Sequence, residues 1–165
     1  MKKTILHLPE MKLVGITTRT SNADAFGCPP KDNPIAQTVQ RYWHEGLAGR
    51  IENRKNPGTT LCVYTQYESD FTGKYTYWIG EKVTALGHVR EGFQTLTIPP
   101  QTYIKFTDGP GPMPHVCIHA WQRIWGMDRA TLGGERAYIA DFEVYDARSH
   151  DPQNVTLDLY IGVRA

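Results

Sequence analysis

The sequence has 165 residues, the size of one ordinary domain, and 40% of them are hydrophobic. The 18 Lys and Arg nearly balance the 17 Asp and Glu, and the longest basic run is Lys2–Lys3. This near-neutral charge argues against direct nucleic-acid binding. No segment reaches the roughly 18 apolar residues of a membrane helix, and no signal-peptide cleavage site follows the first residues. We therefore expect a cytoplasmic protein that does not bind membranes.

The first half of the sequence predicts a strand, a helix and two more strands. The first strand is expected at 11–19. A polar cap at Asn33 followed by Pro34 predicts a helix start. The apolar face of this helix recurs at helical spacing and comprises Ile35, Val39, Tyr42, Trp43 and Leu47. Segments 60–67 and 74–83 are rich in aromatic and β-branched residues and predict an antiparallel pair of strands.

The second half repeats this order. Gln94–Pro100 leads into a strand at 101–107, a helix follows at about 114–127, and strands at 138–145 and 155–163 end the chain. We therefore predict an α+β fold, a single domain over 1–165 built from two β-α-β-β repeats of about 1–92 and 93–165. In this pseudo-two-fold domain the helices cover one face of an antiparallel sheet, because each unit alone is too small to bury both faces. The opposite face is expected to form a central ligand cleft.

Alternation along the last strands suggests what lines that cleft. The aliphatic row from Leu157 to Val163 should face the helices, which leaves Tyr160 on the other side. Phe142 alternates with Glu143, so Glu143 is expected to share the non-helix face with Tyr160. Tyr64 and Tyr103 add aromatic rings to that face, as does either the Tyr75/Tyr77 row or the Trp78/Gly80 row.

A carboxylate among aromatic rings can hold a flat, cationic molecule, because the ligand gains from stacking, from cation–π contact and from the negative charge. The alternative is that these tyrosines are ordinary sheet residues and that Glu143 is solvated. Alternation by itself does not decide between the two.

At these residues the sequence resembles the GyrI-like, or effector-binding, domains of AraC-type and MerR-type multidrug-responsive regulators. The matching stretches are GKYTYWIGEKV at 73–83, LTIPPQTYIKF at 96–106, GP at 109–110, HAWQRIW at 119–125, YIADFEVYD at 138–146 and LDLYIGV at 157–163. The resemblance lies in the ordered set of these stretches, which covers nearly the whole chain.

The resemblance implies a duplicated β-α-β-β fold with a central cleft, and a ligand-contacting glutamate at the position of Glu143. The pocket aromatics of the family carry over to Tyr64, Trp78, Tyr145 and Tyr160, and less directly to Tyr103, Trp121 and Trp125. The two helix tryptophans are expected in the core rather than in the pocket. Because the first strand starts near Met1, we expect a stand-alone member without its own helix-turn-helix, similar to mobile integron-cassette proteins. A separate regulator or gyrase would then be its partner.

We therefore hypothesise a small-molecule binding protein that senses or sequesters amphipathic, cationic aromatic ligands, as part of transcription regulation or on its own. One alternative is a hydrolase in which Glu143 acts as general base on a strained ligand; another is a gyrase-modulating protein. No catalytic residue, cofactor or metal is assigned. His115 and His119 have metal-ligand spacing but lie on the polar side of their helix. The three cysteines show no paired spacing.

Overall fold

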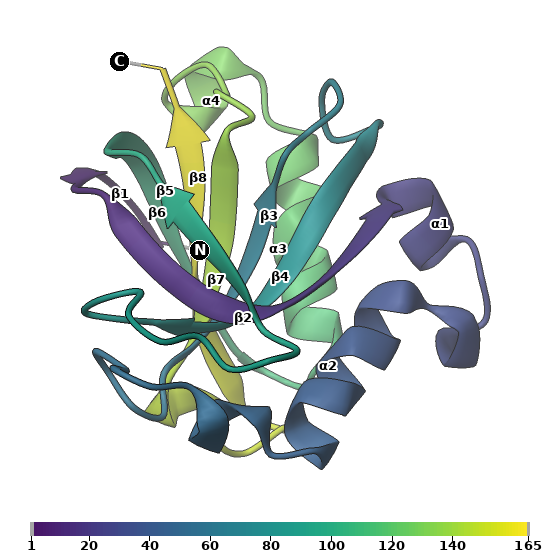
Figure 1. The fold of residues 1–165 in the computed structure, drawn as a ribbon. Helices are drawn as coiled ribbons and strands as arrows, with labels where there is room; N and C mark the ends of the chain where they lie inside the picture. The colour runs from purple at the N-terminus through teal and green to yellow at the C-terminus, as the bar shows by residue number, and fades with distance from the viewer. Residues whose placement is uncertain (1, 165) are drawn as a thin grey trace.

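The computed structural model describes residues 2–164, which form one eight-stranded antiparallel sheet with helices on one side (Figure 1). The strands are β1 (Lys2–Leu8), β2 (Met11–Ser21), β3 (Thr60–Thr65), β4 (Lys74–Lys82), β5 (Gln94–Ile98), β6 (Gln101–Gly111), β7 (Ala140–Tyr145) and β8 (Val155–Val163). The helices are α1 (Asn22–Phe26), α2 (Pro34–His44), α3 (His115–Trp125) and α4 (Arg129–Leu132). The predicted α+β class is confirmed.

The order of the strands across the sheet is β1-β6-β8-β7-β3-β4-β2-β5. Exchanging each strand for the one four places away in the chain reverses this order, as expected for a pseudo-two-fold arrangement. The edge strands cross between the halves, since β1 pairs with β6 and β5 pairs with β2. Strand β1 is not predicted by the sequence pattern, and β5 lies in the segment 94–100 that was expected only to lead into a strand. Both are edge strands with mostly exposed side chains, so their sequences lack the alternation of a half-buried strand.

The two long helices form where the sequence predicts them. The Asn33 side chain caps α2 by accepting hydrogen bonds from the backbone N–H groups of Ile35 and Ala36. Tyr42 of α2 is fully buried and packs in one core cluster, whereas α3 packs in another. Tyr64 and Tyr145 contact both clusters. Both helices therefore cover the same face of the sheet, and these two tyrosines lie where the halves meet.

The face of the sheet away from the helices is filled by the chain's own side chains. Strands β2 and β5, near one edge of the sheet, supply some of these side chains, and Figure 1 shows β2 curving across the sheet. Gly15 of β2 is paired with Gly80 of β4. A Cβ atom at either position would lie within 2.2 Å of a backbone oxygen of the other strand, so the two strands approach too closely there for a side chain. The buried cluster on this face comprises Met11, Leu13, Leu61, Val63, Trp78, Ile98, Tyr103, Ala140 and Phe142. The expected open groove on this face is therefore absent from the part of the chain that the structure describes.

The register of the last two strands also differs from the expectation. Phe142 lies directly opposite Tyr160, and their rings stack at 4.5 Å between centroids. Glu143 lies opposite Leu159 and points to the helix face. The expectation that Glu143 and Tyr160 share a face is therefore wrong, because directly paired residues lie on the same face of a sheet. The expectation assumed that one face is open, whereas here both faces are covered, so an aliphatic row and an aromatic row are each buried.

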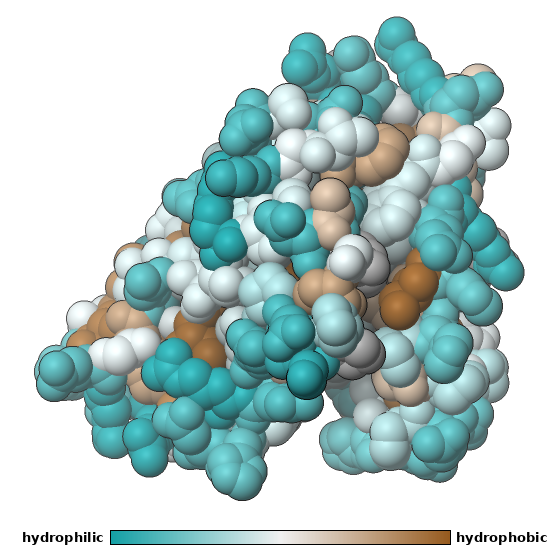
Figure 2. Space-filling view, turned by 90° about the vertical axis from the view of Figure 1, so that its right-hand side faces the viewer, coloured by the Kyte–Doolittle hydropathy of each residue, from teal (hydrophilic) through white to brown (hydrophobic). Residues whose placement is uncertain are grey.

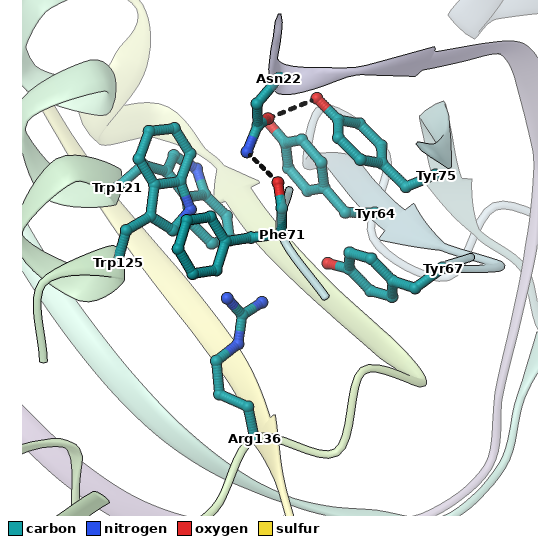
Figure 3. A pocket seen from close by; sticks show the side chains of 8 residues that line it. All are labelled: Asn22, Tyr64, Tyr67, Phe71, Tyr75, Trp121, Trp125 and Arg136. Carbon is teal, nitrogen blue, oxygen red and sulfur yellow. Dashed lines mark hydrogen bonds between the residues drawn. The ribbon is translucent and has the colours of Figure 1, made fainter. Parts of the chain in front are cut away.

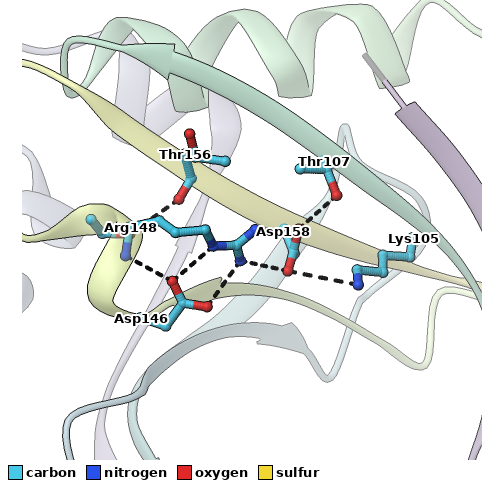
Figure 4. Close-up of polar contacts among 7 residues, drawn as sticks. Lys105, Thr107, Asp146, Arg148, Thr156 and Asp158 are labelled. Atoms are coloured by element: carbon cyan, nitrogen blue, oxygen red, sulfur yellow. Dashed lines mark hydrogen bonds and ion pairs between the residues drawn. The ribbon is translucent and has the colours of Figure 1, made fainter.

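A polar cluster ties the β7–β8 connection to the sheet (Figure 4). Arg148 donates to the carboxylates of Asp146 and Asp158, and Thr107 also donates to Asp158 at 2.7 Å. Lys105 lies 3.8 Å from Asp158. Burial acts to raise the pKa of Asp158, but these hydrogen bonds and positive charges hold it below its usual value. From residue 2 to residue 164, no helix has the length and apolar character needed to cross a membrane.

Candidate functional site

Glu143, in the middle of β7, is buried on the helix face and is surrounded by hydrogen-bond donors. Tyr64 of β3 and the indole N–H of Trp121 in α3 donate to Oε2 at 2.7 and 2.6 Å. Tyr145 donates to Oε1 at 2.6 Å. Only 2% of Glu143 is exposed. The carboxylate thus lies between the two halves, because its donors come from both.

Glu143 has no charge partner among the described residues 2–164, since none of the ion pairs there includes it. Burial, and next the charge of Glu143, raises the pKa of Tyr64 well above its usual value. Burial, Cys117 and Glu143 together do the same for Tyr145. Both phenols therefore remain protonated donors. Hydrogen bonds offset only part of the cost of burying a charge, so the charge of Glu143 is left without full compensation among these residues.

A small cavity lies next to this carboxylate, with room for roughly one water molecule at about 20 Å³. Its walls are almost entirely aromatic (Figure 3). They comprise Asn22, Tyr64, Tyr67, Phe71, Tyr75, Trp121, Trp125 and Arg136. Tyr64 and Trp121 both line the cavity and donate to Glu143, so one layer of rings separates the cavity from the acid.

Phe71, from the loop between β3 and β4, fills part of the space that a ligand would need. Its ring stacks on Trp125 at 5.7 Å with the planes 6° apart. Asn22 holds the loop by donating to the backbone oxygen of Phe71 at 2.8 Å (Figure 3). The surface around α1 and α2 is mostly hydrophilic, with hydrophobic side chains in small separate groups (Figure 2). With room for about one water molecule, the cavity in this structure is too small for a drug-sized ligand, and Phe71 is one of the side chains that limit it.

The structure brings together five of the eight residues singled out from sequence, with Glu143 at their centre. Tyr64, Tyr145 and Trp121 contact Glu143, and Trp125 lines the cavity. Trp121 and Trp125 also pack on the α3 core, so core and cavity wall are the same side chains.

The other three aromatics, Trp78, Tyr103 and Tyr160, lie on the opposite face of the sheet. The pairing of Tyr64 with Tyr77 and of Val63 with Trp78 decides this placement. Tyr75 and Tyr77 therefore form the row that faces the helices, and Trp78 faces away. Alternation alone left this choice open, and the resemblance favoured Trp78.

Sequence reasoning did not assign Asn22, Tyr67, Phe71 and Arg136 to the site. Phe71 and Tyr67 lie in or next to a turn, and Arg136 precedes β7, so no periodicity marks them. An arginine close in sequence to a buried aspartate was the one available signal, since Arg136 pairs with Asp141. Within residues 2–164, no group of three or more His, Cys, Asp or Glu side chains is placed to hold a metal ion.

The sequence matches a known protein family. Residues 4–163 match the family Cass2, described as an integron-associated effector binding protein. The chain belongs to this family. The resemblance to effector-binding domains is thereby confirmed, and small-molecule binding is the activity that the family description supports. No curated protein matches the sequence.

Solved structures share the fold. An integron cassette protein from Vibrio cholerae is 25% identical, with a TM-score of 0.76 over 98% of this chain and 95% of that one. A protein solved with bound tetraphenylphosphonium, SAV2435, is 17% identical, with a TM-score of 0.75 over 100% and 95% of the two chains. The C-terminal domain of EcmrR is 14% identical, with a TM-score of 0.57 over 99% and 97%.

Proposed function

We propose that this protein binds amphipathic, cationic aromatic molecules in the cavity beside Glu143, and that it senses or sequesters them. The observation that carries the proposal is the buried carboxylate with three hydrogen-bond donors and no cationic partner among residues 2–164. A lipophilic cation would supply the missing positive charge, and charge attraction is strong where water is excluded.

The aromatic walls favour the same class of ligand. Tyr64 packs edge-on against Trp121 at 5.0 Å between centroids and against Tyr75 at 5.4 Å. Rings arranged in this way offer faces to a flat ligand and to its positive charge. The related fold bound to tetraphenylphosphonium supports a cation of this type. Binding would require the Phe71 ring to leave its stack on Trp125.

The test is the affinity for tetraphenylphosphonium, measured by quenching of tryptophan fluorescence and by calorimetry. Glu143→Gln keeps the shape of the side chain and removes its charge. We expect binding to weaken about 10- to 100-fold, the scale of a lost charge-assisted interaction. Glu135→Gln, at an exposed carboxylate, is the matched control and should bind as the parent does.

Triphenylphosphine oxide, a neutral aromatic molecule, separates charge from shape. Its affinity should be similar for the parent and for Glu143→Gln, because no ligand charge is lost. Unchanged binding of tetraphenylphosphonium by Glu143→Gln would remove Glu143 from the proposed role.

A further inference from the structure

Arg136 is a buried cation in the wall of the proposed ligand cavity. It lies just before β7 and forms an isolated bridge with Val163 of β8. Its side chain is only 9% exposed, and Figure 3 shows the guanidinium group pointing into the space between Phe71 and Tyr67. Its guanidinium carbon lies 4.3 Å from the centre of the Tyr138 ring, which supports the group from one side.

Among the described residues 2–164, one of the three guanidinium nitrogens has a hydrogen-bond partner. Nη2 donates to Oδ2 of Asp141, whereas Nε and Nη1 are buried and meet no acceptor in this part of the chain. Burial opposes the charge of Arg136, but Asp141 and nearby tyrosines raise its pKa above the usual value, so the group stays charged. Buried donors without partners are rare in folded proteins, because each has lost its hydrogen bonds to water. These N–H groups can therefore donate to an acceptor that residues 2–164 do not provide.

The charges around the cavity indicate what kind of acceptor fits. Asp141 accepts three hydrogen bonds, from Arg136, from Tyr67 and from the backbone N–H of Gly162, and Arg136 balances its charge. The Arg136–Asp141 pair is thus neutral as a unit, and Glu143 leaves one uncompensated negative charge. A ligand with one positive charge balances the site. A second ligand group that carried a negative charge would restore the imbalance in a poorly hydrated space.

We propose that Arg136 donates a hydrogen bond to a neutral oxygen acceptor, such as a ketone or amide carbonyl, on a monocationic aromatic ligand. This inference rests on the proposed function, because it assumes that the positive end of the ligand is held near Glu143. Tyr64 and Trp121 line the same cavity as Arg136 and also donate to Glu143, so a ligand in this cavity contacts the Arg136 wall and lies one layer of rings away from the Glu143 carboxylate. Arg136 is then the specificity residue that distinguishes oxygenated cations from plain hydrocarbon cations.

A matched series of phosphonium ions tests this assignment in the parent protein. The three probes carry an acetyl, an isopropyl or a carboxylate group at the para position of one ring of tetraphenylphosphonium. Acetyl and isopropyl have nearly the same shape, but only acetyl accepts a hydrogen bond. We expect the acetyl probe to bind about tenfold more tightly than the isopropyl probe, as for one hydrogen bond to a charged donor. The zwitterionic carboxylate probe should bind more weakly than the acetyl probe.

Arg136→Lys keeps a positive charge beside Asp141 and removes the planar fork with its unused donors. In this variant we expect the acetyl and isopropyl probes to bind within about twofold of each other. Arg123→Lys, at an exposed arginine on α3, should keep the full acetyl preference. Circular dichroism checks that both variants are folded, and the ligand series in the parent protein decides the question if Arg136→Lys fails to fold.

The outcomes separate this inference from the function on which it rests. If the isopropyl probe binds and requires Glu143, but acetyl gives no advantage, Arg136 does not read an acceptor and only the inference fails. Tightest binding by the carboxylate probe, or an acetyl preference that survives in Arg136→Lys, also overturns it. If no probe binds, or if Glu143→Gln binds all of them equally well, the proposed function fails and the inference falls with it.

Discussion

Asp141 and Glu143 lie two positions apart on β7, so they face the same side of the sheet, and both are buried. Asp141 has an internal cation, Arg136, and also accepts hydrogen bonds from a phenol and a backbone N–H. Glu143 has three neutral donors and, among residues 2–164, no cation. The charge of Asp141 is thus neutralised within the fold, whereas the charge of Glu143 is stabilised by hydrogen bonds alone.

This difference separates a structural acid from a candidate binding acid. A paired buried charge is costly to remove one partner at a time, because the remaining charge is left without compensation. An unpaired buried charge costs stability in the free protein and becomes favourable when a ligand neutralises it. Burial alone would have ranked Asp141 and Glu143 alike, and the presence of a partner distinguishes them.

The largest expected effect is the loss of stability in Asp141→Asn. This change leaves Arg136 buried without its counter-ion and should lower the free energy of unfolding by about 3–5 kcal/mol. Urea denaturation at neutral pH measures the effect.

Glu143→Gln is the matched comparison on the same strand. The glutamine oxygen can accept from Tyr64 and Trp121, and its amide can donate to the phenol oxygen of Tyr145. The free energy of unfolding should therefore change by no more than about 1 kcal/mol. Equal losses in the two variants would show that the two acids do not differ in the way we describe.

An intermediate effect, on ligand affinity, is expected for Phe71, because the small cavity must widen to admit a ligand. Phe71→Ala removes the ring stacked on Trp125, so a ligand no longer has to break this contact. Aromatic pairs contribute about 0.5–1.5 kcal/mol, which corresponds to roughly fivefold tighter binding of tetraphenylphosphonium. Stopped-flow quenching of tryptophan fluorescence should also show faster association.

The control for this change is Phe93→Ala, which removes a partly buried ring that packs on the core cluster of α2, away from Trp125. It should leave the affinity unchanged. Weaker binding by Phe71→Ala would instead indicate that the Phe71 ring contacts the ligand in the bound state.

The same comparison explains how much of the fold could be predicted from sequence. The internal strands and both long helices carry clear periodicity, and Val155–Val163 is found at its predicted bounds. The edge strands β1 and β5 escaped because a strand with one neighbour and exposed side chains has little pattern to detect.

For the candidate site, the sequence singled out the acid and part of the aromatic wall, and their role in binding stays a prediction. Glu143, Tyr64 and Tyr145 are together as expected, but on the face of the helices rather than on the opposite face. The prediction assumed that one face of the sheet is open. In this fold Phe142 and Tyr160 bury the second face, and only the register of β7 against β8 reveals it. Arg136 and Phe71 come from irregular segments, where sequence spacing gives no direction to a side chain.

The smallest expected effect concerns the polar cluster around Asp158, which is a more exposed version of the Arg136–Asp141 pair. Arg148 is 40% exposed, so its loss in Arg148→Ala should cost at most about 1 kcal/mol at neutral pH. The folded-state pKa of Asp158 lies below its usual value, so this stabilisation is present above the unfolded pKa of about 4 and is lost as the pH falls. The stability difference between the parent and Arg148→Ala should therefore shrink in acid.

Denaturation curves from pH 7 down to pH 3 measure this stability difference, with Arg41→Ala, at an exposed helical pair, as the control. A difference that is constant over this range would mean that Arg148 acts through packing and not through the charge of Asp158.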